Sequence, residues 1–410
     1  MDKTFVFYCI LFILVGEFIL ATVMNYLNAK HFKDPIPNEL ADVYNVKEYK
    51  KSQEYKFTNY KFGILTSVFS FALILGFITL GGFAWVDKLA QNTSNNSIIQ
   101  ALVFFGVIMI GSDIINIPFS YYQTFVIEEK FGFNKTTHKT FLVDKLKQWG
   151  MTIILGGGIL ALIIWFFQWA GTNFWLYTWA VVSLFILLMN LFYSKLIVPL
   201  FNKQEPLEAG SLKDKIKNYA ANVGFDLQQI FVINGSKRST KANAYFSGFG
   251  KEKRVTLYDT LINDLEEEEI VAVLAHEIGH YKRKHIIFNL AASILLTGIM
   301  LFLLSLFINN PEVSLAIGVE RPSFHAALIG FGILYSPISE ITGLLMNHFS
   351  RKFEFQADDF AKDTYAAMPL VSSLKKLSKN NLSNLTPHPA YVFMHYSHPP
   401  LIDRIRNLKA

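Results

Sequence analysis

Five consecutive residues, His276-Glu277-Ile278-Gly279-His280, follow the pattern His-Glu-x-x-His. Residues four apart lie on one face of an α-helix, so both imidazoles can bind one metal ion while Glu277 reaches a water on that ion. The pattern therefore predicts a hydrolytic zinc site with Glu277 as general base. The alternative is a surface helix with two incidental histidines.

A catalytic zinc ion takes three protein ligands and keeps a fourth position for water. After His280 the chain continues Tyr281-Lys282-Arg283-Lys284-His285, which has the wrong spacing for the third histidine of a metzincin. A glutamate on a separate helix is the other option, and Glu354 fits it, with Asp358 four residues later on the same face. We expect Glu354 to bind the metal and Asp358 to orient a ligating imidazole. A solvated helix face is the alternative for this pair.

The segment before the metal motif carries the signals of a helix start. Asn263-Asp264 is a cap candidate, and the acidic run Glu266–Glu269 complements the positive end of a helix dipole. We expect the helix that begins here to run through the metal motif. Three segments before it carry strand-forming residues and predict a small antiparallel sheet, namely Gln229–Asn234, Asn243–Phe249 and Arg254–Tyr258.

The composition places the site in a membrane protein. Of 410 residues, 52% are hydrophobic and 17% charged, which is too apolar for a soluble enzyme and too charged for a chain wholly in lipid. The single cysteine, Cys9, excludes internal disulfides and Cys-based zinc sites. The formal charge of +6 comes with lysines scattered through loops, so we expect a lipid bilayer and no nucleic acid as partner.

Seven apolar segments are long enough to cross the roughly 30 Å of bilayer hydrocarbon as helices. They lie near 4–26, 62–86, 98–120, 150–169, 174–197, 286–307 and 324–346. Polar residues inside them are costly in lipid and should face protein or water, namely Glu17, Asp113, Asn116, Asn190 and Glu340.

The distribution of lysine and arginine predicts the orientation. Seven lysines lie between spans one and two and five between spans three and four, whereas the loops between spans two and three, four and five, and six and seven contain only Lys88 and Arg321. Because positive loops stay in the cytosol, we expect the N-terminus outside and the segment 198–285 and the C-terminal tail inside.

Four segments together resemble the CAAX prenyl endopeptidase family of membrane zinc proteases. They are His276–His280, Ser350–Asp358, Tyr396–Ile405 and Asn243–Phe249, the last of which is similar to the substrate-binding strand of that family. The likeness covers the whole chain. It implies a barrel of seven helices around a large water-filled chamber, with a gluzincin-like zinc domain at its cytosolic end and one zinc ion per chain.

The resemblance also implies roles for residues outside the metal motif. His398 matches a histidine close to the metal, and we expect it to stabilise the oxyanion, while Arg404 pairs structurally or contacts substrate. A packing histidine before Pro399-Pro400 is the alternative. Asn243, Ala244 and Tyr245 are expected to bind an extended substrate by strand addition, and an ordinary hairpin strand is the alternative.

We therefore expect an all-α membrane protein with a small α+β part, divided as 1–197, 198–285, 286–346 and 347–410. Its expected function is zinc-dependent cleavage of peptides near the C-terminus, with removal of a C-terminal tripeptide and a second upstream cut from prenylated substrates implied by the resemblance. The chain is expected to act as a monomer, in the endoplasmic reticulum of a eukaryote or the inner membrane of a bacterium. A membrane quality-control metalloprotease is the alternative enzyme, and a transporter or receptor with a degenerate motif is the alternative from another class.

Overall fold

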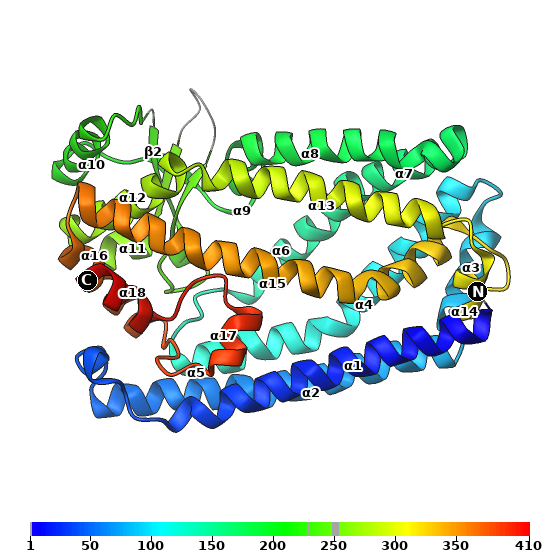
Figure 1. Cartoon of the computed structure of the whole chain (residues 1–410), viewed down its shortest axis with the longest axis horizontal. Helices are drawn as coiled ribbons and strands as arrows, with labels where there is room; N and C mark the ends of the chain where they lie inside the picture. The colour runs from blue at the N-terminus through cyan, green and yellow to red at the C-terminus, as the bar shows by residue number, and fades with distance from the viewer. Residues whose placement is uncertain (1, 228, 248–253) are drawn as a thin grey trace.

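The structure is a computed structural model that describes residues 2–227, 229–247 and 254–410. Long helices run side by side along the longest axis of the molecule, and the small sheet lies at one end of them, near α10 and α12 (Figure 1). The N-terminus lies at the opposite end from the sheet. The expectation of a mainly helical protein with a small α+β part is confirmed.

Six helical stretches of the described chain are long and apolar enough to cross a membrane. In each of them, at most 22% of the most apolar window is buried inside the protein. Their apolar side chains therefore face outward, as lipid requires and water would not allow. The six stretches are Lys3–Lys33, Val46–Thr79, Ser97–Phe131, His138–Phe201, His285–Phe307 and Phe324–Thr364.

The expected fourth and fifth spans both lie in the stretch His138–Phe201, which reverses direction. Gly171 has a φ of 56°, a conformation that glycine adopts without a Cβ penalty. The helices before and after it, α7 and α8, pack against each other. The stretch comprises α6 (His138–Met151), the π-helical η4 (Thr152–Gly156), α7 (Gly157–Ala170), η5 (Gly171–Asn173) and α8 (Phe174–Leu196).

Two other helices have bounds that differ from the expected spans. The helix α2 (Val46–Thr79) ends at Thr79 rather than at residue 86, because Gly81 adopts a φ of 74° and the short α3 (Gly82–Thr93) begins after it. The helix α15 (Phe324–Thr364) continues well past residue 346. The expected domain boundary at 346 therefore falls inside a helix, and α15 extends from a membrane span into the α+β part.

The remaining membrane helices are α1 (Lys3–Lys30), α4 (Ser97–Tyr122) and α13 (His285–Phe307). Short elements connect the spans, namely η1 (His31–Lys33), η2 (Asn38–Leu40), the π-helical η3 (Gln123–Glu128), α5 (Glu129–Phe131), α9 (Val198–Phe201) and α14 (Pro311–Ala316). The other elements are α10 (Ser211–Asn222), η6 (Gly235–Lys237), α11 (Asp259–Asp264), α12 (Glu267–Lys282), α16 (Ala367–Asn380), α17 (Pro389–His395) and α18 (Leu401–Lys409).

The sheet has four strands in the order β1-β2-β4-β3. The pairs β1–β2 and β3–β4 are antiparallel, but β2 and β4 are parallel, so the expectation of a purely antiparallel sheet is wrong. The expected strand Asn243–Phe249 is seen as β3, while Gly248 and Phe249 lie outside the described residues. The strands are β1 (Gln204–Pro206), β2 (Gln229–Ile233), β3 (Ala244–Ser247) and β4 (Arg254–Tyr258).

The helix of the metal motif is held by the core of the α+β part. Its inward face buries Ile270, Val271, Leu274 and Ile278, each no more than 1% exposed. It begins at Glu267 rather than at the expected cap Asn263, which belongs to the preceding helix α11. The carboxylate of Glu269 accepts a hydrogen bond from the Glu266 backbone N–H at this start.

Candidate metal centre

Two neighbouring helices, α12 and α15, bring His276, His280 and Glu354 together (Figure 1). One ligand atom from each lies within 4.8 Å of the other two. The Nε2 atoms of the two histidines are 3.1 Å apart, and the Glu354 carboxylate oxygens lie 3.4 Å from His276 Nε2 and 3.2 Å from His280 Nε2. The two imidazole nitrogens and the carboxylate thus converge on one point between the helices.

The spacing and the chemistry of these atoms fit a metal ion. Two ligands at 2.0–2.1 Å from a tetrahedral ion are separated by about 3.3 Å, which matches the three observed distances. Glu354 is 4% exposed, and its Oε2 atom lies 3.4 Å from His276 Nε2 and 3.3 Å from Arg404 Nη1, with no well-formed hydrogen bond in the described chain. A buried carboxylate is stabilised by nearby cations, so a metal ion at this point would add to the stabilisation from Arg404.

A second layer of charged groups orients His276. Asp358 Oδ1 lies 2.9 Å from His276 Nδ1, and Arg404 donates from Nε and Nη2 to the two Asp358 oxygens at 2.8 and 2.6 Å. Burial lowers the pKa of His276, but its hydrogen bonds to Asp358 and Glu354 raise it more, to about 9. A metal ion at this site therefore competes with a strongly held proton.

The other histidine of the cluster, His280, contacts residues that were not predicted as site residues. His285 Nδ1 lies 3.0 Å from His280 Nδ1, and His285 Nε2 lies 2.8 Å from Gln356 Oε1. The His285 ring also stacks on Phe353 with 4.2 Å between centroids. His285 has the wrong spacing from His280 to be the third ligand of a metzincin. Its position five residues after His280 is the feature of the sequence that could have indicated a supporting role.

Glu277 lies between the two ligating histidines in the sequence. Burial raises the pKa of its carboxyl group, and the neighbouring histidines oppose that shift. A carboxylate with a raised pKa is better matched to taking a proton near neutral pH. The environment of Glu277 therefore suits a general base.

The structure also brings His398 to this cluster. Its Nε2 lies 3.3 Å from Glu354 Oε1, and its Nδ1 lies 3.0 Å from Ser397 Oγ. The side chain is 64% exposed, in contrast to the buried ligand set. It therefore lies where a substrate can reach both it and the metal cluster.

The strand β3 packs beside α12. In the described chain it pairs only with β4, through Ala244 opposite Leu257 and Tyr245 opposite Thr256, so its other edge is open for pairing. The Asn243 carbonyl accepts a hydrogen bond from the Tyr258 N–H at 3.1 Å. The expected substrate-binding residues thus lie on or next to an edge strand that contacts the metal helix.

Apolar helices of membrane-spanning length and a His-His-Glu cluster beside an edge strand define an integral, multi-pass membrane metallopeptidase. Comparison with known proteins agrees. Residues 25–203 match the family model described as CAAX prenyl protease N-terminal, five membrane helices, and residues 206–410 match peptidase family M48.

Curated relatives extend over nearly the whole chain. A CAAX prenyl protease 1 homolog from Oryza sativa is 36% identical and covers 98% of this chain and 96% of its own. CAAX prenyl protease 1 of Saccharomyces cerevisiae is 33% identical over 96% of this chain and 93% of its own. The crystal structure of S. mikatae Ste24p matches with a TM-score of 0.93, at 32% identity over 99% of both chains.

The chain belongs to peptidase family M48 and, within it, to the CAAX prenyl endopeptidase family. The resemblance noted in the sequence is thereby confirmed. The protein is a metalloendopeptidase, a hydrolase of peptide bonds.

Proposed function

We propose that this protein is a zinc-dependent endopeptidase that cleaves C-terminally prenylated proteins, removing a C-terminal tripeptide and making a second cut upstream. The observation that carries the proposal is the His276, His280 and Glu354 cluster in a chain whose relatives bear the name CAAX prenyl protease 1. The same relatives favour this activity over general membrane quality control. The intact ligand set and Glu277 argue against a transporter or receptor with a degenerate motif.

Zinc is the metal that the donor set supports best, with one ion per chain. Two imidazole nitrogens and one carboxylate oxygen are the ligands of gluzincin-type catalytic zinc, and the distances between them suit tetrahedral coordination. When bound, zinc supplies a Lewis acid for the scissile carbonyl and lowers the pKa of a water molecule. The remaining steps fall to side chains of this protein.

Glu277 is proposed to take the proton from the attacking water and later to deliver it to the leaving amine. His398 is proposed to donate a hydrogen bond to the oxyanion that develops on the scissile carbonyl. Asp358 and Arg404 hold the His276 ring in its ligating orientation. Asn243, Ala244 and Tyr245 present the open edge at which an extended substrate adds as a strand.

The chain is proposed to cross the membrane seven times, because the reversal at Gly171 divides the stretch His138–Phe201 into two crossings. The spans are proposed to enclose the family's water-filled chamber. The lysine-rich loops support an N-terminus outside and a metal site on the cytosolic side. We propose a monomer in the endoplasmic reticulum of a eukaryote or the inner membrane of a bacterium.

Purified protein in detergent tests the proposal. Its bound metals are measured by mass spectrometry, and a farnesylated C-terminal peptide is compared with the same peptide without the lipid. We expect about one zinc ion per chain and release of a tripeptide, with the farnesylated peptide preferred. The matched control Glu277→Gln keeps the metal and loses hydrolysis, since it removes the base but no ligand. Equal turnover by this variant would refute the assignment of the base.

A further inference from the structure

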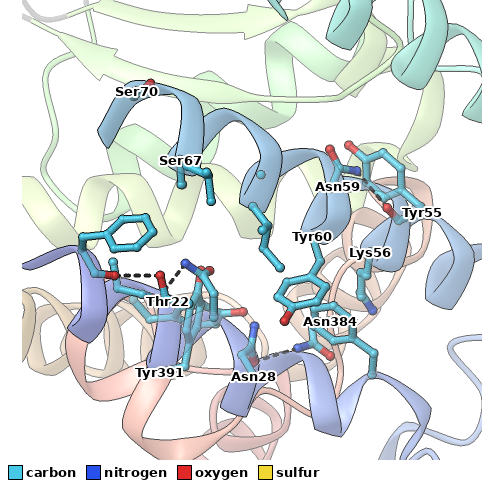
Figure 2. Close-up of a pocket in the computed structure, with 18 of the residues that line it drawn as sticks. Thr22, Asn28, Tyr55, Lys56, Asn59, Tyr60, Ser67, Ser70, Asn384 and Tyr391 are labelled. Carbon is cyan, nitrogen blue, oxygen red and sulfur yellow. Dashed lines mark hydrogen bonds between the residues drawn. The ribbon is translucent and has the colours of Figure 1, made fainter. Parts of the chain in front are cut away.

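A cavity of about 730 Å³ lies between α1, α2 and the C-terminal segment 381–396 (Figure 2). Toward the middle of the spans its walls include apolar Leu14 and Phe18 of α1 and Val68 of α2, together with the polar residues Glu17, Thr22, Ser67 and Ser70. Toward the α+β part its walls carry polar side chains, among them Lys56 and Asn384. The cavity is therefore suited to an amphiphilic ligand.

Among the described residues, Lys56 is the only cation that lines this cavity. Its ammonium donates to Ser52 Oγ at 2.9 Å and to the Ser383 carbonyl at 2.7 Å, which leaves one of its three N–H groups for another partner. In the part of the chain that the structure describes, no carboxylate lies within 4.0 Å of it. A partly buried ammonium without an anion is costly, so the position favours an anionic ligand.

Glu17, the one carboxylate that lines the cavity, lies too far along the helices to neutralise Lys56. The neighbour of Glu17, Phe18, stacks on Phe71 with 4.3 Å between ring centroids. Phe71 follows Lys56 by fifteen residues on α2, which is about 22 Å at 1.5 Å per residue. The charge of Lys56 thus remains available to a ligand.

One residue of the cavity wall is hydrogen-bonded to the helix that carries Glu354. Tyr396 lines the cavity, and its carbonyl accepts a hydrogen bond of 2.6 Å from Arg351, which lies one helical turn before Glu354 on α15. Two residues after Tyr396 comes His398, whose Nε2 is 3.3 Å from Glu354 Oε1. Tyr396 thus places one side of the cavity next to the segment that bears His398.

The segment 381–396 is fixed against both membrane helices that form the cavity. Asn28 Oδ1 on α1 accepts a hydrogen bond from the His388 backbone N–H at 3.1 Å, and Thr386 Oγ1 donates to the His31 carbonyl at 2.8 Å. On α2, Lys56 binds the Ser383 carbonyl. The cavity is thus a built feature with ordered walls rather than a gap beside a loose loop.

We propose that this cavity binds the C-terminal tripeptide of the substrate and that Lys56 pairs with its terminal carboxylate. The inference rests on the proposed function. Three extended residues span about 10 Å, so a carboxylate fixed at Lys56 determines how far from the chain end the scissile bond falls. Tyr60, one turn after Lys56 on α2, and Phe32, whose ring lies 6.4 Å from that of Tyr60, line the cavity and can contact the side chains of the tripeptide. Every free chain end carries an α-carboxylate, so pairing with Lys56 would favour C-terminal segments.

Two farnesylated peptides that differ only at the C-terminus test the site, one with a free carboxylate and one with a carboxamide. We expect wild-type protein to cleave the acid with a kcat/KM about 10–100-fold above that of the amide, as a charge-assisted contact predicts. Lys56→Met should reduce the ratio of acid to amide cleavage to about one, whereas any loss of the Ser383 contact should affect both peptides equally. Lys56→Arg and Ser52→Ala keep the charge and should keep most of the preference.

Cleavage of the amide peptide also reports whether each variant is folded. An acid preference that persists in Lys56→Met overturns the inference, and so does an equal loss with both peptides, which would show that Lys56 only anchors Ser383. A preference that disappears when phosphatidylglycerol replaces neutral lipid would assign Lys56 to a lipid phosphate and overturn the tripeptide site. Wild-type protein that cleaves neither peptide contradicts the proposed function itself, whereas equal cleavage of both contradicts only this site.

Discussion

At the scale of residues, the site depends on groups that hold the ligands as much as on the ligands themselves. The far nitrogen of His276 faces Asp358, and the far nitrogen of His280 faces His285, which in turn contacts Gln356. The supporting groups Asp358 and Gln356 both belong to α15. The helix that carries Glu354 therefore also supports the orientation of both imidazoles of the proposed metal site.

Removing a proposed metal ligand should weaken metal binding more than removing a residue that only supports a ligand. We expect Glu354→Ala to lose both metal and activity, because only two protein ligands remain. Asp358→Ala should retain the site but weaken metal binding about 10–100-fold, as losses of such supporting groups do. Zinc titration with a competing chelator measures both effects.

The neighbouring carboxylate Asp359 is a matched control, since it accepts a hydrogen bond of 2.8 Å from Asn407 and takes no part in the cluster. Asp359→Ala should bind zinc as the wild type does. Full zinc stoichiometry in Glu354→Ala would mean that another residue is the third ligand.

His398 is expected to act on the transition state rather than on the metal. Loss of one oxyanion donor typically costs about 10²–10³ in turnover, so His398→Ala should keep zinc and KM but lose most of kcat. Steady-state kinetics together with metal analysis measure the two effects. The exposed His395, whose ring lies 4.5 Å from that of Tyr391, is the matched control. Lost zinc in His398→Ala would make it a ligand, and an unchanged kcat would make it a packing residue.

At the scale of elements, the close approach of α12 and α15 sets the geometry of the site. Gly279, inside the metal motif, lies against α15 so closely that a Cβ atom there would be 3.1 Å from the Ala357 Cα and carbonyl oxygen and from Phe360 Cβ. Two of these three atoms belong to the backbone, which cannot rotate away. The missing side chain therefore lets Glu354 approach the two histidines.

Gly279→Ala should force the two helices apart by a few tenths of an ångström. We expect a loss of about 1–3 kcal/mol in the free energy of unfolding, typical of overpacking, and weaker zinc binding. Thermal unfolding in detergent, with and without chelator, measures both. Gly332→Ala, on the same α15 but with no atom within 4 Å of the added Cβ, is the control and should change neither. A Gly279→Ala protein as stable as wild type would show that the helices adjust freely.

At the scale of the whole molecule, the proposed seven crossings can be tested with single cysteines. Replacing Cys9 by serine removes the only native thiol. Cysteines at Lys88, Thr172 and Arg321 should react with a membrane-impermeant maleimide from outside, and cysteines at Lys135 and Lys217 only after permeabilisation. Thr172 lies in the turn between α7 and α8, so its labelling reports directly whether these two helices cross the membrane separately. Labelling of Thr172→Cys from the same side as Lys135→Cys would contradict the seventh crossing.

The sequence by itself determined the features that depend on local geometry and on hydropathy. His276 and His280 share a helix face because a helix has 3.6 residues per turn, and this requires no knowledge of the fold. The apolar segments stand out because a chain in lipid must satisfy its backbone internally and cover it with apolar side chains. Family membership followed from motifs that are contiguous in the chain.

Only the tertiary structure decided which distant segments meet and where elements end. Glu354 comes within 3.4 Å of His276 because α12 and α15 pack, and this pairing is not encoded in the spacing of the two residues. The parallel pairing of β2 with β4, the end of α2 at Thr79 and the start of α12 at Glu267 also depend on long-range contacts and turns. The supporting role of His285 and the cavity around Lys56 could not be predicted from the sequence either. Each is formed by segments that only the packed helices bring together.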